Sequence, residues 1–350
     1  MTERVVYLLG AGFSAPLGLP LTSNFLEKSK DLYFREPIRY KHFARVLETI
    51  AEMSVVKNYY RTDLHNIEEI LSILDMKQSL RGQRLRKEFL TYISDVIAAF
   101  TPVLRAQPTG WPANWHEGVF GSAGVPGRNY GYFVASLLHT RVEAGERIVP
   151  LSVTRHSGGK AVYSVVTLNY DHVLERFASY LRDSFQGVAP AFQGSQATQD
   201  AGTPLAKLHG SAESEIIVPP TWNKSVTRKL LPSWNLAFEL LATANHIRII
   251  GYSLPVADSY VKYLLRGAAI EATHLKRIDV LCLDDSRRTT FHRYTAFVDF
   301  QNFRYVSART EDYVKKVYEV TAGVSRIGAK VLDFDCLERA HEEFFSSAGH

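Results

Sequence analysis

The sequence predicts an α/β fold, a Rossmann-like doubly wound parallel sheet with a helical insertion and C-terminal helices. Short apolar segments rich in β-branched residues recur along the chain, and helical segments separate them. Each apolar segment ends in small or polar residues, as strands do at the ligand-binding edge of an open parallel sheet. The predicted strands comprise residues 5–9, 161–168, 203–208, 247–250 and 278–283.

The first predicted strand runs directly into a glycine-containing loop, Gly-Ala-Gly-Phe-Ser, at residues 10–14. Gly10 and Gly12 can adopt positive φ angles and let the backbone approach a ligand, and free N–H groups at the following helix start favour a phosphate. Two glycines also fit an ordinary strand-to-helix turn, so this loop alone leaves both interpretations open. Gly18 and Pro20 end the first helical turn early, which favours a loop wrapped around a ligand.

A helical insert is predicted over residues 23–145. Apolar residues recur at three- and four-residue spacings in residues 64–74 and again in residues 85–100, which is typical of amphipathic helices. Asp63 suits the N-cap of the first of these helices. The polar residues near its start match no zinc-binding spacing and are expected on its solvated side; they are His65, Asn66, Glu68 and Glu69.

The second half of the insert combines a loop with a helix. Residues 106–131 are rich in Gly, Pro and Trp, and the aromatic residues favour an ordered loop over a flexible linker. A further helix is predicted over residues 130–143. The densest basic group of the chain precedes this region and is expected to form a solvated helix face rather than a nucleic-acid site; it comprises Arg81, Arg84, Arg86 and Lys87.

Small or polar residues follow the later strands at the edge where an open α/β sheet binds its ligand. These residues are Asn169, Asp171, His209, Gly251, Ser253 and Asp284. For Asn169 and Asp171, the alternative is a cap on the helix that begins near residue 172. Because the residues recur at successive strand ends, the set favours a ligand site more strongly than any single member does.

The composition indicates a globular chain, with 46% hydrophobic and 22% charged residues among 350. No apolar run approaches the ~20 residues of a membrane span, and no signal peptide precedes the first strand, so no membrane partner and a cytoplasmic location are expected. The net charge of +5 is dispersed, which argues against nucleic-acid binding. We expect a single domain over residues 1–350, with core segments 1–22 and 160–290 and C-terminal helices over 310–347.

Four of these motifs, in this order, resemble the NAD-binding and catalytic motifs of the sirtuin superfamily. They are Gly10-Ala11-Gly12-x-Ser14, Thr167-Leu168-Asn169-Tyr170-Asp171, Leu208-His209-Gly210 and Gly251-Tyr252-Ser253-Leu254. Leu168 stands where sirtuins have a glutamine, and no acidic-aromatic-arginine run follows Pro20. The Asn-Tyr-Asp version is similar to the bacterial sirtuin-like branch found in anti-phage defence, whose members hydrolyse NAD.

The resemblance implies an NAD glycohydrolase, which converts NAD to nicotinamide and ADP-ribose and acts in anti-phage defence by NAD depletion. Asn169 would orient a water or ribose hydroxyl, and Asp171 would hold the carboxamide or support the loop. His209 would act as general base, since an imidazole titrates near working pH. The residues expected to bind NAD are Gly10, Ala11, Gly12, Ser14, Gly251, Ser253 and Asp284.

The chain departs from sirtuin deacylases in its cysteines. Only Cys282 and Cys336 are present, so the two cysteine pairs of the sirtuin zinc ribbon are missing and no zinc or other metal is expected. Hydrolysis of free NAD therefore ranks above NAD-dependent protein deacylation. An alternative function, outside the enzymes, is that of a non-catalytic subunit that senses NAD or ADP-ribose. A dehydrogenase is disfavoured because the first loop lacks a third glycine at the Rossmann spacing.

The defence branch also implies partners for this chain. Its members work as oligomers or with a second subunit, such as a nucleic-acid translocase ATPase or an Argonaute-like protein. We therefore expect a homo-oligomer or such a complex. The Trp-rich residues 106–131 are the predicted interface, because aromatic residues are enriched at protein interfaces.

Overall fold

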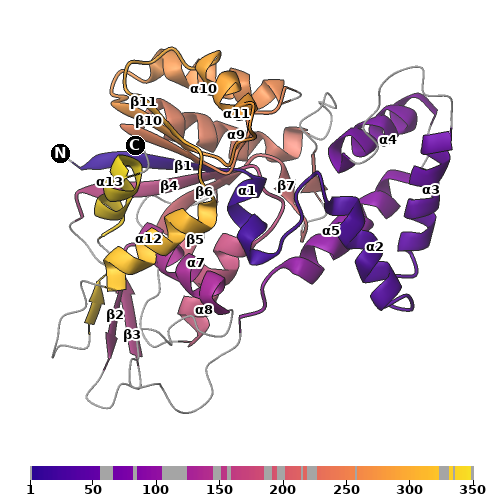
Figure 1. The fold of residues 1–350 in the computed structure, drawn as a ribbon, viewed down its shortest axis with the longest axis horizontal. Coiled ribbons are helices and arrows are strands. Elements are labelled where there is room, and N and C mark those ends of the chain that lie inside the picture. Colours follow the sequence, from indigo (N-terminus) through magenta and orange to yellow (C-terminus); the bar gives the residue numbers. More distant parts are fainter. Residues whose placement is uncertain are drawn as a thin grey trace.

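The computed structural model has a seven-stranded parallel sheet with helices on both faces, which confirms the predicted fold class (Figure 1). The structure describes residues 2–55, 66–81, 85–104, 124–144, 151–155, 159–184, 191–194, 202–213, 216–218, 227–256, 258–322, 331–333 and 336–347. Among these residues, no helix is both long and apolar enough to cross a membrane.

The strand order in the sheet is β11-β10-β9-β1-β4-β6-β5, and each neighbouring pair is parallel. Without the edge strand β5, this is the order of a dinucleotide-binding sheet, whose winding reverses between β1 and β9. Two short edge strands, β5 and β11, add to the five predicted ones. The strands are β1 (Glu3–Leu9), β4 (Ala161–Thr167), β5 (Ala191–Gln193), β6 (Gly202–Lys207), β9 (His246–Ile250), β10 (Arg277–Leu281) and β11 (Phe303–Val306).

The side chains of β1 alternate between two hydrophobic cores. Val5, Tyr7 and Leu9 join the core under one face, while Val6 and Leu8 join the core under the other. Because both faces are covered, the strand reads as an unbroken apolar run in the sequence. The helices that cover the first face are α7 (Gly124–Leu137), α8 (Val173–Ser184), α12 (Thr310–Ala322) and α13 (Leu337–Ser347). Those that cover the second are α9 (Thr227–Ala242), α10 (Ser259–Glu271) and α11 (Thr289–Thr295).

The helical insert divides into two parts that lie in different places. Four helices form a group beyond the carboxyl end of β1, to the right in Figure 1. They are α2 (Phe25–Arg35), α3 (Phe43–Val55), α4 (Ile67–Arg81) and α5 (Leu85–Phe100). In contrast, α7 packs on the sheet against α12 and α8. Only the first part is therefore an addition beside the sheet, and α7 belongs to its covering layer.

The helix predicted over residues 130–143 was wrong at both ends. The observed α7 starts at Gly124 and ends at Leu137, and β2 (Thr140–Ala144) follows it. His139 lies between them with a φ of 50°, which does not continue a right-handed helix. Pro126 stands in the first turn of α7, where a missing N–H is tolerated, so this part of the predicted loop is a helix start. Residues 105–123 of that loop lie outside the described residues.

A small antiparallel sheet continues from α7. It has the strand order β12-β2-β3, so the region up to residue 145 that was predicted as helical ends in a strand. Its other strands are β3 (Leu151–Arg155) and β12 (Val331–Asp333), and β12 separates the two predicted C-terminal helices, α12 and α13. A two-stranded hairpin of β7 (Gly210–Ser211) and β8 (Ile216–Ile217) lies directly after His209.

The start of α4 also differs from the prediction. Asp63 lies outside the described residues, and Asn66 instead accepts hydrogen bonds from the first turn of α4. Its Oδ1 atom lies 3.0 Å from the backbone nitrogen of Glu68 and 3.3 Å from that of Glu69. Asparagine is among the residues that best satisfy the free N–H groups of a helix start.

The prediction of a solvated basic face was wrong for Arg86. Its Nε atom donates to Oδ1 of Asp75 at 2.5 Å, and its Nη2 atom donates to the carbonyl of Ile217 at 3.0 Å. Asp75 is buried, so this pair links α4 and α5 to the hairpin after His209. The side chains of Arg81 and Arg84 lie outside the described residues.

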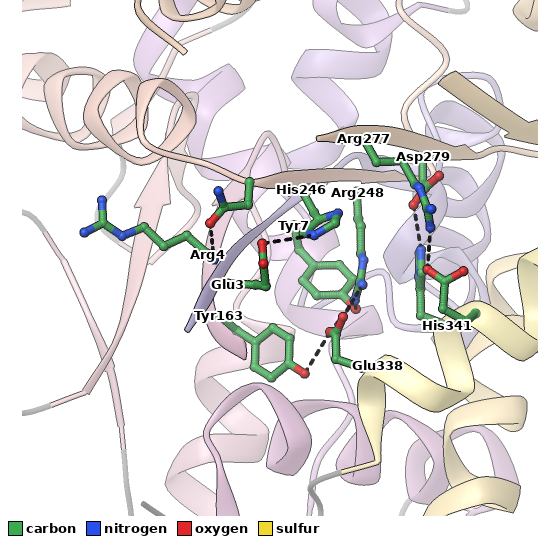
Figure 2. A network of polar contacts seen from close by, with 12 residues as sticks. Glu3, Arg4, Tyr7, Tyr163, His246, Arg248, Arg277, Asp279, Glu338 and His341 are labelled. Carbon is green, nitrogen blue, oxygen red and sulfur yellow. Dashed lines mark hydrogen bonds and ion pairs between the residues drawn. The ribbon is translucent and has the colours of Figure 1, made fainter. Parts of the chain in front are cut away.

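A polar network around the buried Arg248 and the half-buried Glu338 connects α13 to the sheet (Figure 2). The Arg248 guanidinium on β9 donates to the two carboxylate oxygens of Glu338 on α13 at 2.8 and 2.7 Å. It also donates to the Tyr7 hydroxyl on β1 at 2.8 Å. The Tyr163 hydroxyl on β4 donates to Glu338 at 2.9 Å. Glu338 thus contacts side chains from two strands directly and is linked to a third through Arg248.

Candidate functional site

A cavity of about 660 Å³ lies at the carboxyl edge of the sheet, where the loops after β1, β4, β6 and β9 meet. Its volume falls within the ~300–1,000 Å³ range of small-molecule and cofactor sites. The winding of the sheet reverses here, which is where doubly wound sheets bind their ligands. The sequence-predicted site residues that line it are Gly10, Ala11, Gly12, Ser14, Asn169, Asp171, His209, Gly251 and Ser253; Asp284 is not among its lining residues.

Three glycines let the loops after β1 and β9 pack directly against each other. A Cβ atom on Gly10 would lie 2.6 Å from the carbonyl oxygen of Gly251, and one on Gly12 would lie 2.9 Å from the Gly251 Cα. Gly251 has a φ of 66°, and its own Cβ would lie 2.2 Å from the nitrogen of Phe13. The positive φ expected at Gly10 and Gly12 is not found, because only Gly251 of the three adopts it. These glycines permit close contact between loops.

The backbone N–H groups of the first loop are used within the protein. Gly10 donates to Ile250 at 3.0 Å, Gly12 donates to Gly251 at 2.9 Å, and Phe13 donates to Gly10 at 2.8 Å. The helix that follows, α1 (Ala11–Ser14), has only four residues. The expectation of free N–H groups for a phosphate is therefore wrong for these three residues.

Asn169 is buried, and the loop after β1 fixes its side-chain amide. Its Nδ2 atom donates to the Gly10 carbonyl at 3.0 Å and to the Ser14 hydroxyl at 3.2 Å. Its Oδ1 atom has no hydrogen-bond partner among the described residues. A buried acceptor without a partner costs ~1–3 kcal/mol. A ligand hydroxyl or a water that donates to Oδ1 would remove this cost.

Asp171 lines the cavity and also serves the start of α8. Its Oδ1 atom accepts the N–H of Val173 at 3.0 Å. Asp171 therefore caps the start of α8, which was the alternative role considered from the sequence. Burial raises the pKa of the Asp171 carboxyl, while the Lys207 charge and hydrogen bonds from Val173 and Ser14 oppose this rise. Ser14 therefore connects Asn169 to Asp171.

His209 follows β6 and is 5% exposed. Burial lowers the pKa of its imidazole, and this effect outweighs the Asp258 charge and a hydrogen bond with the Leu168 backbone. The imidazole is therefore neutral at pH 7 and able to accept a proton. The Tyr170 ring lies beside it, with 6.1 Å between the ring centroids.

Asp284 does not line the cavity and instead binds the start of α11. Its carboxylate accepts backbone N–H groups of Thr290 at 2.9 Å and Phe291 at 2.8 Å, at the start of α11. It also accepts the Tyr305 hydroxyl from β11 at 3.1 Å. The two residues before it, Cys282 and Leu283, line the cavity instead. This position gives no support to the ribose-binding role predicted for Asp284.

Three acidic residues that the sequence did not predict for the site line the cavity: Glu68, Asp258 and Glu311. Asp258 is 1% exposed and accepts the Tyr252 hydroxyl at 2.7 Å. Glu68 accepts the Tyr170 hydroxyl at 3.4 Å. Glu68 was expected on the solvated side of its helix. Acidic residues are common in the first turn of any helix, so the sequence offered no sign of this placement.

Among the described residues, one group offers ligand atoms within 4.8 Å of one another for a metal ion: Asp279, His341 and Glu342. Arg304 donates to Asp279 at 2.6 and 2.9 Å and to Glu342 at 3.0 Å. A cationic side chain thus already balances both carboxylates. The expectation that the protein holds no zinc stays a prediction.

The fold and the cavity together define a doubly wound α/β protein with a cavity at the reversal of its winding. No protein-family model and no curated protein matches the chain. A similar solved structure is Sir2 in complex with the inhibitor EX-527, 2′-O-acetyl-ADP-ribose and a deacetylated p53 peptide. The identity is 12% and the TM-score 0.33, over 90% of this chain and 93% of that chain.

Two further solved structures are similar to the chain, with the same sequence identity and a comparable TM-score. They are Sir2Tm bound to a propionylated peptide and a complex of Sir2, a p53 peptide and NAD⁺. Each has 12% identity and a TM-score of 0.35, and each alignment covers 91% of this chain and 93% of that chain.

Proposed function

We propose that the protein is an NAD glycohydrolase, which cleaves NAD to nicotinamide and ADP-ribose. The observation that carries this proposal is the position of Asn169 and His209 on one cavity at the winding reversal of a dinucleotide-type sheet. The free Oδ1 of Asn169 supplies an acceptor there, and the neutral imidazole of His209 supplies a base. The resemblance of the strand-end motifs to NAD-hydrolysing sirtuin-like proteins supports the same activity.

The reaction breaks the bond between C1′ of the ribose and the ring nitrogen of nicotinamide. The bonding electron pair leaves with nicotinamide, and the ribosyl fragment passes through a state like an oxocarbenium ion. The oxygen of a water molecule then bonds to C1′, and His209 takes up the proton that this water loses. Asn169 holds that water or a ribose hydroxyl through Oδ1. Asp171 supports Asn169 through Ser14.

Free NAD is proposed as the substrate in preference to an acylated lysine. The cysteine pairs that a sirtuin-type zinc ribbon requires are missing from the sequence. In their place, the chain carries the helices α2–α5, and residues from α4 and α5 line the cavity. A site enclosed by the chain's own helices suits a small molecule better than an extended peptide.

Incubation of the purified protein with NAD is expected to release nicotinamide and ADP-ribose, or a cyclic form of it, in equal amounts. Mass spectrometry of the mixture checks this and separates three activities at once. A deacylase would form O-acyl-ADP-ribose only when an acylated peptide is added. A sensor would bind NAD and return it unchanged, and that result would remove the catalytic proposal.

We further propose that the protein is a defence effector that depletes NAD and is restrained by self-assembly or by a partner subunit. Unrestrained NAD hydrolysis would kill the cell that makes the enzyme. Exposed apolar side chains on one face of α10 support an assembly surface, because Tyr263 is 66% and Ile270 is 85% exposed. The Trp-rich loop that was predicted as the interface falls largely outside the described residues.

Light scattering at micromolar concentration is expected to give a mass above that of one 39.5 kDa chain. If the protein assembles through α10, replacing Tyr263 and Ile270 by serine should lower this mass and change the rate of NAD hydrolysis. A protein that is strictly monomeric and hydrolyses NAD at full rate without additions would contradict control by assembly.

A further inference from the structure

Helix α4 brings one acidic side chain, Glu68, to the cavity. Ile67 and Leu71 of the same helix also line the cavity, while Ile70 and Leu74 are buried in the hydrophobic core. The apolar stripe that predicts an amphipathic helix therefore packs α4 against the site. Glu68 is part of the face that meets the cavity and not of the solvated face.

The position of α4 is tied to the segment that carries His209. Arg86 of α5 bonds to the buried Asp75 of α4 and to the carbonyl of Ile217 on β8. The residue after Ile217, Val218, donates its N–H to the carbonyl of His209 at 3.0 Å. Ile217 itself lines the cavity. These bonds of Arg86 and Val218 thus link the helix that carries Glu68 to the backbone of His209.

Among the described residues, no lysine or arginine acts on the Glu68 carboxylate. The Tyr170 hydroxyl donates to it, and the negative charge of Asp258 acts on it. Burial, and then the Asp258 charge, raise the pKa of Glu68 to about 7. The other ionisable side chains that line the same cavity are Tyr170, Asp171, His209, Tyr252, Asp258, Cys282, Arg309 and Glu311.

Helix stability alone does not explain why the acidic side chain of Glu68 lies at the cavity. Negative charge in the first turn of a helix is favourable, and Glu69, the next residue of α4, provides the same charge. Glu69 does not line the cavity. The half-buried Glu68 and the buried Asp258 place two carboxylates beside one space, and no lysine or arginine of the described residues is ion-paired to Glu68. This arrangement suits a ligand that carries positive charge.

We propose that the Glu68 carboxylate stabilises the positive charge that the ribosyl fragment acquires as nicotinamide leaves. This inference rests on the proposed NAD hydrolysis. When the bond between C1′ and the nicotinamide nitrogen breaks, the positive charge of the pyridinium ring passes to C1′ and the ring oxygen of ribose. An ionised carboxylate of the enzyme stabilises this charge in the transition state, whereas His209 receives the proton of the attacking water.

The test compares Glu68→Gln with Glu69→Gln as the matched control. Glu68→Gln keeps the shape and removes the charge; it should lower kcat by about 10²-fold and raise KM for NAD⁺ only several-fold. In the wild type, kcat/KM should rise as the pH increases through about 7, because only ionised Glu68 is effective and this ratio reports the pKa of the free enzyme. This rise with pH should be absent in Glu68→Gln and present in Glu69→Gln. A Glu68→Gln enzyme with the rate and pH profile of the control would overturn the inference.

If the wild type releases no nicotinamide, the proposed function is refuted. The charge of Glu68 can then still be tested by measuring ligand binding. Calorimetry at pH 8, in a His209→Ala background, compares NAD⁺ with NADH, which lacks the positive charge of the pyridinium ring. With Glu68 present, NAD⁺ should bind several-fold more tightly than NADH, and Glu68→Gln should remove that preference. The same preference in both proteins would contradict a role of the Glu68 charge.

Discussion

Replacing Asn169 or His209 by alanine is expected to lower the rate of nicotinamide release by at least ~10²-fold. For Asn169, the loss comes from the buried Oδ1 acceptor and from the amide that holds Gly10 and Ser14 in place. For His209, it comes from a base that burial keeps neutral at pH 7. The assay measures nicotinamide by mass spectrometry at saturating NAD, with thermal unfolding as a check on the fold.

Two exposed residues provide matched controls for these substitutions. Asn302→Ala and His292→Ala remove the same chemical groups from exposed residues that do not line the cavity, and they should retain the wild-type rate. Ser14→Ala removes one partner of the Asn169 amide and leaves its Oδ1 atom, so its loss of rate should be smaller than that of Asn169→Ala. Nicotinamide release at the wild-type rate in both Asn169→Ala and His209→Ala would refute the catalytic assignment.

The sheet and most of the cavity were predictable because parallel strands have a simple sequence pattern. A strand buried on both faces is an unbroken apolar run, and the polar residue that ends it must lie at the carboxyl edge. This reasoning brings Asn169 and His209 to one edge, and the structure places both on one cavity. The same pattern misleads at Asp284, because an acidic residue after a strand can equally satisfy the free N–H groups of the next helix.

The glycine loops show a second limit of sequence reasoning. Gly10 and Gly12 were expected to make room for a ligand, whereas they make room for Gly251, a partner about 240 positions away in the sequence. The sequence shows where the glycines stand, but it does not show which atom a Cβ at that position would clash with. Glu68 was missed for a related reason, since a helical period shows which residues share a face and not what the opposite face meets.

The largest loss of stability is expected from Arg248→Met. Arg248 is 2% exposed and donates two hydrogen bonds to Glu338 and one to Tyr7. Burial raises the pKa of Glu338, but the Arg248 charge and its hydrogen bonds outweigh burial and keep that pKa low, so Glu338 is ionised at pH 7. The Glu338 side chain is 37% exposed, so water screens part of the charge that the substitution leaves without its cation. Three hydrogen bonds from a buried guanidinium are lost as well, and we expect a total cost of ~1–3 kcal/mol. Urea unfolding at pH 7 measures the loss.

Arg277→Met on the neighbouring strand β10 is the matched control. Arg277 pairs with Glu342 of the same helix α13, but the Arg277 side chain is 35% exposed whereas that of Arg248 is 2% exposed, and an exposed pair is worth ~0–1 kcal/mol. Removing the Glu338 charge as well, in Arg248→Met with Glu338→Leu, should recover part of the stability lost in Arg248→Met. If Arg248→Met unfolds at the same urea concentration as Arg277→Met, the network in Figure 2 does not hold α13 on the sheet.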